Sequence, residues 1–362
     1  MAIAYVLEQN ASVAREGERL LIKKGGAVLH ALHVFKLDQL VLFGNVFLTP
    51  AAISCLLQRG IDTVFMTRYG RYRGRLQGLH GKNITLRQEQ FRKMENEGFC
   101  LKTARAIVDG KIANLRGALL RLNRSREGLG LEDHILSLKR LAQKAAEAAD
   151  MDVLRGYEGR SAALYFEGFS RGFLADEVKF KKRVRRPPTD PVNALLSLGY
   201  TLLFNTVMAA VSLVGFDPYL GCLHTVEYGR PSLALDLMEE WRPIIVDTLV
   251  LSVFNLKALS LDDFVIGGIA EEDLEDGDNA DLEGDASVDE DTDESPPPPP
   301  VKLTDSGFRK FLAQFERKMA QKVRFHLTGQ QFSYRDCIRE QIRHFARYVR
   351  GNEGLYQPML LR

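Results

Sequence analysis

Apolar and polar residues alternate through most of residues 1–80, a pattern that predicts short strands rather than helices. Glu16-Gly17-Glu18 fits a hairpin turn between the second and third of them. One helix interrupts the strands, with Thr49 as its cap and Pro50 at its first position. The expected strands are Ala4–Leu7, Ser12–Arg15, Arg19–Lys23, Gln39–Phe43, Thr63–Met66 and Tyr72–Leu76. Many short strands with few long apolar runs predict a small β-rich domain.

From Gln88 on, apolar residues recur at helical spacing and strand signals fade. The expected helices include Lys102–Asn123, with a break at Gly110, and Met151–Phe166. A third begins at Asp190-Pro191 and stops at Gly215, and a fourth is capped by Ser232 and runs towards Trp241. The last two are residues 307–322 and 334–350. We therefore predict an α+β chain. A small N-terminal β-domain over residues 1–86 precedes a larger, all-α-helical domain over residues 87–362.

The segment from Asn193 to Phe216 carries no charge and is long enough to cross a bilayer. It also contains polar side chains such as Ser197, Thr201 and Asn205, which a lone span would expose to lipid. We predict a buried core helix and no membrane association. The alternative, a membrane span, fails if the purified chain is soluble without detergent.

Charge is distributed very unevenly along the chain. Residues 271–295 hold 14 acidic residues and neither Lys nor Arg, and five prolines follow at 296–300. This composition predicts a disordered insert over about 265–302. Without residues 271–295 the chain has 49 basic and 33 acidic residues, a net charge of +16. So basic a body predicts a polyanionic partner.

The four cysteines, Cys55, Cys100, Cys222 and Cys337, are far apart and form no CxxC pair. This spacing argues against a disulfide scaffold and a zinc finger, and it fits a reducing cytosol. The first residues lack the basic and apolar regions of a secretory signal. We expect a cytoplasmic protein.

Several familiar site motifs are absent, including GxxxxGK[ST], HExxH and a GxGxxG that follows a strand. His224 draws attention instead, because it lies on a Gly- and Pro-rich connection between two predicted helices. Such a connection fixes the position of an imidazole. The alternative is a hydrogen-bonded histidine with a purely structural role.

The helix after His224 carries Asp236, Glu239 and Glu240 among apolar neighbours. Carboxylates enclosed in this way lie close to the core, where an unpaired charge is costly. The alternative is a solvated helix face whose acids pair with Arg230 or Arg242.

Glu158 is surrounded by small residues that would let a ligand approach closely. The alternative is a favourable contact with the dipole at a helix start. Together, Glu158, His224 and Glu239 make a set of two carboxylates and one imidazole that suits Mg²⁺ or Mn²⁺. A zinc site that uses the nearby Cys222 is a further alternative, although no second cysteine is near it in sequence.

Two basic segments are candidates for contact with phosphates. Residues 179–186 hold six bases, and arginines recur every three or four residues through the last helix. The predicted DNA-binding residues are Lys179, Lys181, Lys182, Arg183, Arg185, Arg186, Arg339 and Arg343. A solvated helix face is the alternative explanation for the arginine stripe.

Several ordered blocks of this sequence resemble the CRISPR-associated integrase family, the metal-dependent endonuclease of the spacer-acquisition module. The blocks are Gln9-Asn10, Gly44-Asn45-Val46, residues 110–114 (GKIAN), Tyr157-Glu158-Gly159, residues 185–200 (RRPPTDPVNALLSLGY), Gly221-Cys222-Leu223-His224 and residues 229–240 (GRPSLALDLMEE). The resemblance covers nearly the whole chain. The acidic insert is the clear departure from the family pattern.

The resemblance implies an N-terminal β-domain that mediates dimerisation and a helical domain that holds Mg²⁺ or Mn²⁺. The family's ligand positions fall on Glu158, His224 and Glu239, with Asp236 as a supporting or alternate ligand. The implied reaction is attack of a DNA 3′-hydroxyl on a phosphodiester of a CRISPR repeat array, during antiviral adaptation. Implied partners are double-stranded and branched DNA, a second copy of the chain and a small ferredoxin-like protein. The alternative function is a non-catalytic DNA-binding scaffold of the same fold.

Overall fold

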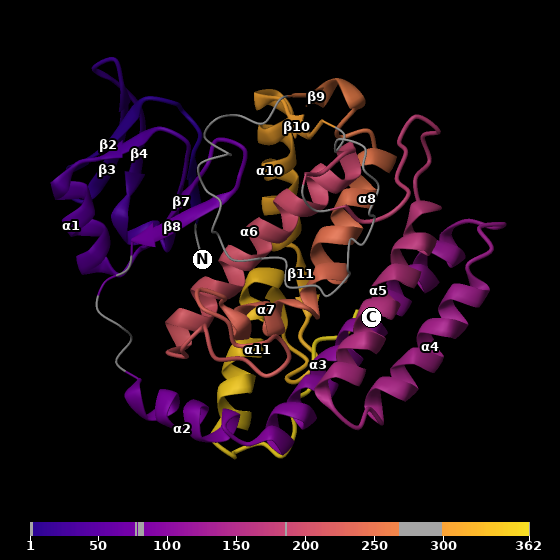
Figure 1. The fold of residues 1–362 in the computed structure, drawn as a ribbon. Helices are drawn as coiled ribbons and strands as arrows, with labels where there is room; N and C mark the ends of the chain where they lie inside the picture. Colours follow the sequence, from indigo (N-terminus) through magenta and orange to yellow (C-terminus); the bar gives the residue numbers. More distant parts are fainter. Residues whose placement is uncertain (1–2, 77, 79–82, 185–186, 268–298, 362) are drawn as a thin grey trace. The chain divides into compact units, whose positions relative to one another are not determined.

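The computed structural model describes residues 3–76, 78, 83–184, 187–267 and 299–361. These residues form two compact units, one that ends before Asn83 and a larger one that begins there. The smaller unit is rich in strands and the larger one is mainly helical (Figure 1). The sequence-based boundary after residue 86 and the dimerisation role of the first unit stay predictions.

Two four-stranded sheets make up the described part of the N-terminal unit. The first has the order β1-β5-β7-β8, with the β1/β5 and β5/β7 pairs parallel and β7/β8 antiparallel. Its strands are β1 (Ile3–Val6), β5 (Gln39–Phe43), β7 (Asp62–Met66) and β8 (Tyr72–Leu76). The second, ordered β4-β3-β2-β6, contains β4 (Ala27–His33), β3 (Arg19–Lys24), β2 (Ala11–Glu16) and β6 (Val46–Leu48). One apolar core takes side chains from both sheets and from the helix α1 (Pro50–Arg59).

The local signals in this unit predicted its elements well. Glu16 pairs with Arg19 across the β2–β3 hairpin, and Gly17 at the turn has a φ of 59°. Thr49 caps α1 by accepting a hydrogen bond from the amide of Ala52 at 3.3 Å. The strands β4 and β6 were missed, because β4 is exposed along most of its length and β6 has only three residues.

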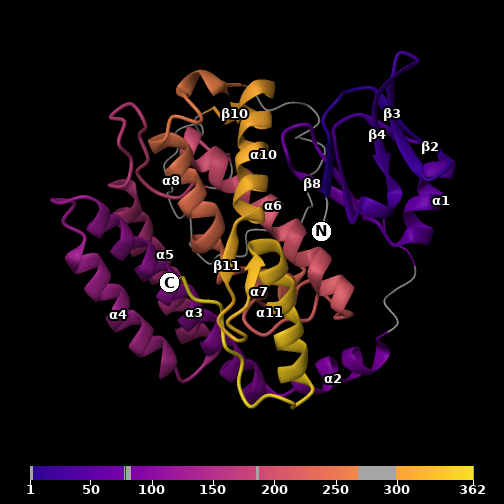
Figure 2. The ribbon, with the colours of Figure 1, turned by 180° about the vertical axis from the view of Figure 1, so that it is seen from behind.

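The helical unit is built around the buried helix α6 (Figures 1 and 2). Its helices are α2 (Ile84–Met94), α3 (Glu97–Ser125), α4 (Glu132–Ala146), α5 (Met151–Ser170), α6 (Pro191–Val214), α7 (Ser232–Met238), α8 (Thr248–Asn255), α10 (Asp305–Ala320) and α11 (Tyr334–Val349). Helices α7, α8 and α11 pack against α6, whereas α3, α4 and α5 pack against one another. Within this unit, α6 is the centre of the core.

The end signals of α6 act as predicted. The side chain of Asp190 accepts a hydrogen bond from the amide of Asn193 at 2.8 Å, and Gly215 ends the helix with a φ of 102°. Length and composition would allow α6 to cross a membrane, but 89% of its most apolar 18-residue window is buried inside the protein. The prediction of a buried core helix is confirmed.

The prediction of an all-α C-terminal part was wrong. Two small antiparallel sheets lie within it, one of β9 (Phe264–Ile266) with β10 (Val301–Leu303) and one of β11 (Lys322–Arg324) with β12 (Gln331–Ser333). Three-residue strands are too short to give a periodic signal. The predicted bounds of the insert, 265–302, were too wide, because residues of β9 and β10 lie inside them. Residues 268–298, including the acidic stretch, lie outside the described residues.

Two further expectations were wrong in detail. Gly110 does not interrupt α3, which runs unbroken through it. Ser232 does not cap α7 with its side chain. Its hydroxyl donates instead to the carbonyl of Thr225 at 2.9 Å. Beyond α7 the chain widens into a π-helical turn over Arg242–Asp247, a distortion that often marks functional sites.

Candidate active site

Glu158 and Glu239 converge on the ammonium group of Lys111 inside the helical unit. Lys111 lies on α3, Glu158 in the middle of α5 and Glu239 directly after α7. The Lys111 Nζ is ion-paired with Glu158 Oε1 and lies 2.6 Å from Glu239 Oε2. The exposed fractions are 3% for Lys111, 5% for Glu158 and 1% for Glu239. Three separate elements thus bring two buried carboxylates to one point.

This placement corrects two alternatives left open by the sequence. Glu158 is not at a helix start, since α5 begins at Met151. Asp236, Glu239 and Glu240 do not form a solvated face, because each is at most 1% exposed. The pattern of apolar neighbours around them was the informative signal.

Arg242 supplies a second buried cation. Its Nε lies 3.1 Å from Glu239 Oε1, and its guanidinium stacks 4.7 Å from the ring centroid of Tyr200 on α6. Two carboxylates and two cations therefore balance in charge, which is how buried ionised groups are stabilised. Asp247, at the other end of the same π-helical turn, accepts a hydrogen bond from the Tyr200 hydroxyl at 2.6 Å. Burial raises the pKa of Asp247 to about 6.

Asp236 holds the loop that carries His224. Its carboxylate accepts hydrogen bonds from the amides of Cys222, Leu223 and His224 at 2.6, 2.9 and 3.0 Å. The His224 Nδ1 lies 2.6 Å from Asp236 Oδ1. The carboxylate favours a proton on Nδ1, which places the lone pair of the imidazole on Nε2. A carboxylate that orients a histidine in this way is typical of metal-binding sites.

Neighbouring elements also anchor this loop. Gly221 is required, because a Cβ there would lie 2.5 Å from Asp236 Oδ2. Arg155 of α5 donates to the carbonyl of Leu223 at 2.7 Å. Buried Gln90 of α2 donates to the carbonyls of Asp217 and Leu220 at 2.8 and 2.9 Å. The imidazole of His224 thus lies on a connection bonded to three helices, α2, α5 and α7.

The donor set suits a hard divalent cation, because it pairs two carboxylates with an imidazole in the required tautomer. Among the residues that the structure describes, no three His, Cys, Asp or Glu side chains are grouped closely enough to hold a metal ion. The two glutamates instead close around Lys111. The ligand assignment of Glu158, His224 and Glu239 therefore stays a prediction that the donor chemistry supports. The zinc alternative with Cys222 has no such group of ligands among the described residues either.

Glu240 ties the end of the chain to the same region. Its carboxylate lies 3.0 Å from the hydroxyl of Tyr356 and accepts the amide of Met359 at 3.0 Å. Asn114 of α3 donates to the carbonyls of Glu240 and Met359 and accepts the amide of Leu361. Burial raises the pKa of Glu240 to about 8. These contacts dock residues 356–361 (the C-terminal strap) beside Glu239 and Lys111.

The predicted DNA-binding residues fall into different environments. Lys179, Lys181 and Lys182 are exposed, as a phosphate contact requires. Arg183 is bonded to α6, with Nη1 2.9 Å from Asn193 Oδ1 and Nη2 2.9 Å from Ser197 Oγ. Arg185 and Arg186 lie outside the described residues. The three lysines are therefore the better candidates for contact with DNA in this segment.

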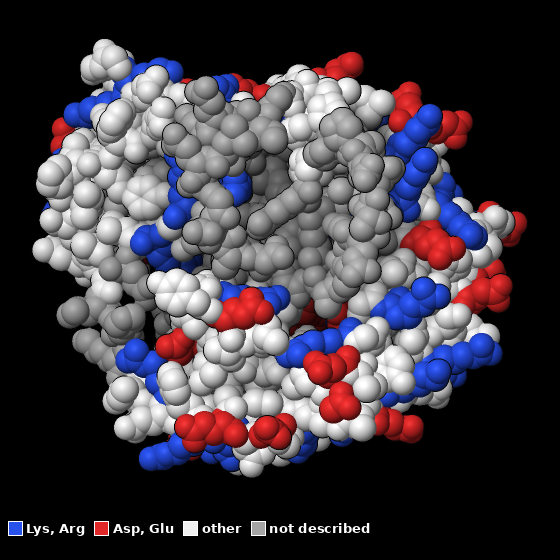
Figure 3. Space-filling model, in the orientation of Figure 1, with Lys and Arg blue, Asp and Glu red and all other residues white. Residues whose placement is uncertain are grey.

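The arginine stripe of α11 is paired with acids. Arg339 contacts Asp336 at 2.8 Å and Arg343 contacts Glu340 at 2.5 Å, both on the same helix. Arg335 is buried and contacts Glu316 of α10 at 2.7 Å. Basic and acidic side chains are also interspersed over the right and lower parts of the face seen in Figure 3. The ion pairs of Arg335, Arg339 and Arg343 reduce the net positive charge that α11 presents to phosphates.

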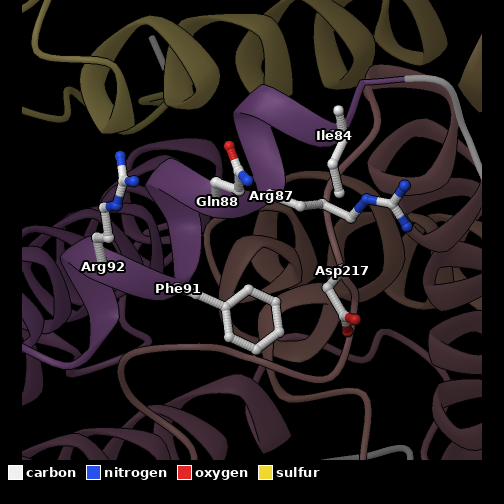
Figure 4. A pocket seen from close by; sticks show the side chains of 6 residues that line it. All are labelled: Ile84, Arg87, Gln88, Phe91, Arg92 and Asp217. Atoms are coloured by element: carbon white, nitrogen blue, oxygen red, sulfur yellow. The ribbon is translucent and has the colours of Figure 1, made fainter.

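An open hollow of about 480 Å³ lies elsewhere in the helical unit. It is lined by α2 and by the start of the loop after α6 (Figure 4). The lining residues are Ile84, Arg87, Gln88, Phe91, Arg92 and Asp217. None of the predicted ligand residues lines it, so it is separate from the candidate active site.

Comparison with known proteins gives one family. Residues 4–270 match the family model described as CRISPR associated protein Cas1. A Thermus thermophilus protein named CRISPR-associated endonuclease Cas1 3 is 33% identical over 364 residues, which cover 100% of this chain and 98% of that protein.

Two solved structures are similar in fold. A chain of a Cas6-RT-Cas1–Cas2 complex matches 100% of this chain at 23% identity with a TM-score of 0.80, and the match spans 36% of that longer chain. A casposase bound to its integration product matches 99% of this chain at 20% identity with a TM-score of 0.80, over 93% of its own length.

Proposed function

Because this chain belongs to the CRISPR-associated Cas1 family, we propose that it is a divalent-cation-dependent DNA integrase and endonuclease that inserts short fragments into a CRISPR repeat array. The observation that carries the proposal is the convergence of buried Glu158 and Glu239 on one cation, Lys111. The contact of His224 Nδ1 with Asp236, which leaves Nε2 as the nitrogen that could bind a metal, supports it. Relatives named endonucleases support a nuclease or integrase activity.

Glu158, Glu239 and His224 would hold Mg²⁺ or Mn²⁺. When bound, such a cation polarises a phosphoryl oxygen and stabilises negative charge on the departing oxygen. The reaction is a transesterification in which a fragment's 3′-oxygen forms a bond to phosphorus as the bond to the array's own 3′-oxygen breaks. The proton lost by the attacking hydroxyl is balanced by one gained by the leaving oxygen.

The protein contributes mainly positioning and charge. Asp236 fixes both the backbone and the imidazole of the His224 loop, so little ordering remains to be done when substrate binds. Arg242 stays ion-paired with Glu239 and keeps that carboxylate in one orientation. The buried helix α6, on which Arg242 stacks through Tyr200, supplies a rigid support.

Exposed Lys179, Lys181 and Lys182 are the proposed contacts with duplex and branched DNA. We further propose that the chain acts as a homodimer with a small ferredoxin-like partner in the cytoplasm. The similar chain found in a complex with Cas2 supports a protein partner. Arg339 and Arg343 are weaker candidates for DNA contact, because each already has an acidic partner.

The test is integration of a labelled fragment into a repeat-carrying plasmid, with Mn²⁺ or with EDTA. We expect strand transfer with Mn²⁺ alone, and its loss in Glu158→Ala, His224→Ala and Glu239→Ala. Glu167→Gln is the matched control, because Glu167 lies on the same helix as Glu158 but its side chain is 65% exposed. Full activity of His224→Ala would contradict the assignment. DNA binding without strand transfer under any condition would favour a non-catalytic scaffold.

A further inference from the structure

Lys111 has a position that the proposed chemistry does not explain. Its ammonium group lies between Glu158 and Glu239, and only 3% of the residue is exposed. A lysine buried this deeply loses most of the hydration that stabilises its charge, so it requires the two carboxylates as compensation. The two carboxylates in turn require a nearby cation, because two negative charges repel each other strongly where water is excluded.

We propose that Lys111 is a positioning residue whose ammonium group takes the place of the divalent cation between Glu158 and Glu239 in the metal-free protein and withdraws when that cation binds. The inference rests on the proposed function, because it takes the two glutamates as metal ligands. Lysine suits the role, since its charge is a compact group on a flexible four-carbon stem. The stem allows withdrawal without movement of α3.

The charges of the site show what such an exchange achieves. Glu158 and Glu239 are balanced by Lys111 and Arg242, so the four residues sum to zero. A bound divalent cation adds two positive charges to this region, and the withdrawn ammonium stays attached to the same stem. The loaded site then attracts the negatively charged phosphates of DNA more strongly than the metal-free site does. Binding of the cation and entry of DNA phosphate are therefore coupled.

An ordinary structural lysine gives a different expectation. If Lys111 only stabilises the fold, its removal lowers stability and leaves cation affinity unchanged or weaker. If it competes with the cation, its removal lowers the stability of the metal-free protein and raises cation affinity. The two measurements then change in opposite directions.

The experiment compares the wild type, Lys111→Met and Lys310→Met. Methionine keeps an unbranched stem and removes the charge. Lys310 is the control, because its ammonium pairs with buried Asp263 at 2.8 Å and with neither glutamate. Thermal unfolding is measured in EDTA and in Mn²⁺, and Mn²⁺ affinity is measured by calorimetric titration in the same buffer for all three proteins.

We expect Lys111→Met to unfold at a lower temperature than the wild type in EDTA and to bind Mn²⁺ at least about tenfold more tightly. The control should match the wild type in affinity. A variant that folds only with Mn²⁺ would also support the proposal, since the cation then replaces the ammonium. Equal or weaker affinity, or failure to fold even with Mn²⁺, would overturn it. A wild type that binds no Mn²⁺ would instead refute the metal site itself.

Discussion

Gly110 allows the C-terminal strap to lie against α3, and replacing it with alanine tests how firmly that strap is held. A Cβ on Gly110 would lie 2.5 Å from Cγ of Pro358 and closer still to its Cβ. Both residues are held in place, Gly110 inside α3 and Pro358 between strap residues that bond to other elements. The added methyl group must therefore displace the strap.

The free energy of unfolding should fall although alanine is the better helix former. Alanine in place of glycine favours a helix by about 1 kcal/mol. Overpacking with local adjustment costs about 1–3 kcal/mol. If the strap undocks, it also loses the two contacts with Glu240, worth about 1 kcal/mol each. The buried side chains of Tyr356 and Met359 then lose about 1.5–3 kcal/mol each. After the gain in helix propensity is subtracted, we expect a net loss of about 0–2 kcal/mol if the strap adjusts locally and of about 4–7 kcal/mol if it undocks.

Urea unfolding of Gly110→Ala, Gly117→Ala and the wild type measures this loss. Gly117 lies seven residues further along α3, and a Cβ there would meet atoms of Leu361 only at 3.7–3.9 Å, an ordinary contact. Gly117→Ala should therefore be as stable as the wild type or about 1 kcal/mol more stable. A Gly110→Ala protein as stable as Gly117→Ala would refute the reasoning, because it would show that the strap gives way at no cost.

Three further outcomes are expected. Glu240→Gln should flatten the pH dependence of the free energy of unfolding in EDTA. Burial raises the pKa of Glu240 from 4.5 to about 8 in the folded state, so the wild type loses stability as the pH rises from about 4.5 to 8. Urea unfolding at several pH values measures this, and an unchanged slope would contradict it. Asp236→Asn should lower Mn²⁺ affinity by about 10–100-fold, measured by calorimetry, since it disturbs the orientation of His224. Deletion of residues 271–295 should leave thermal stability nearly unchanged. If their 14 acids compete with DNA, the deletion also tightens binding of random duplex at low salt in a side-by-side titration, whereas equal affinities would show that they do not compete.

Elements with strong local signals were predictable from sequence. The bounds of α6 follow from Asp190-Pro191 at one end and Gly215 at the other, and these residues act within one turn of the helix. The short strands β9 to β12 were not predictable, since their pairing depends on partners brought together by the rest of the fold. The mixed α/β class was therefore predicted correctly, whereas the all-helical character of the second part was not.

The candidate site divides in the same way. Residue types and family resemblance singled out Glu158, His224 and Glu239 before any geometry was known. The role of Lys111 could not be inferred, because Glu158 lies 47 positions away along the chain. Asp236 was expected near the ligands, but its bonds to three loop amides depend on how the loop folds back over α7. The pairing of Arg335 with Glu316 could not be predicted either, because the two residues lie on different helices.

The small sheet of β9 and β10 brings the described residues on either side of residues 268–298 next to each other. Ile266 pairs with Val301, and the amide of Gly267 donates to the carbonyl of Pro300 at 3.1 Å. The entropy of closing a loop grows only with the logarithm of its length, by about 0.6 kcal/mol for each doubling. A compact reporter domain whose own termini are adjacent could therefore replace residues 271–295 without straining the fold. This position is therefore a suitable insertion site for a fluorescent protein that reports assembly on DNA.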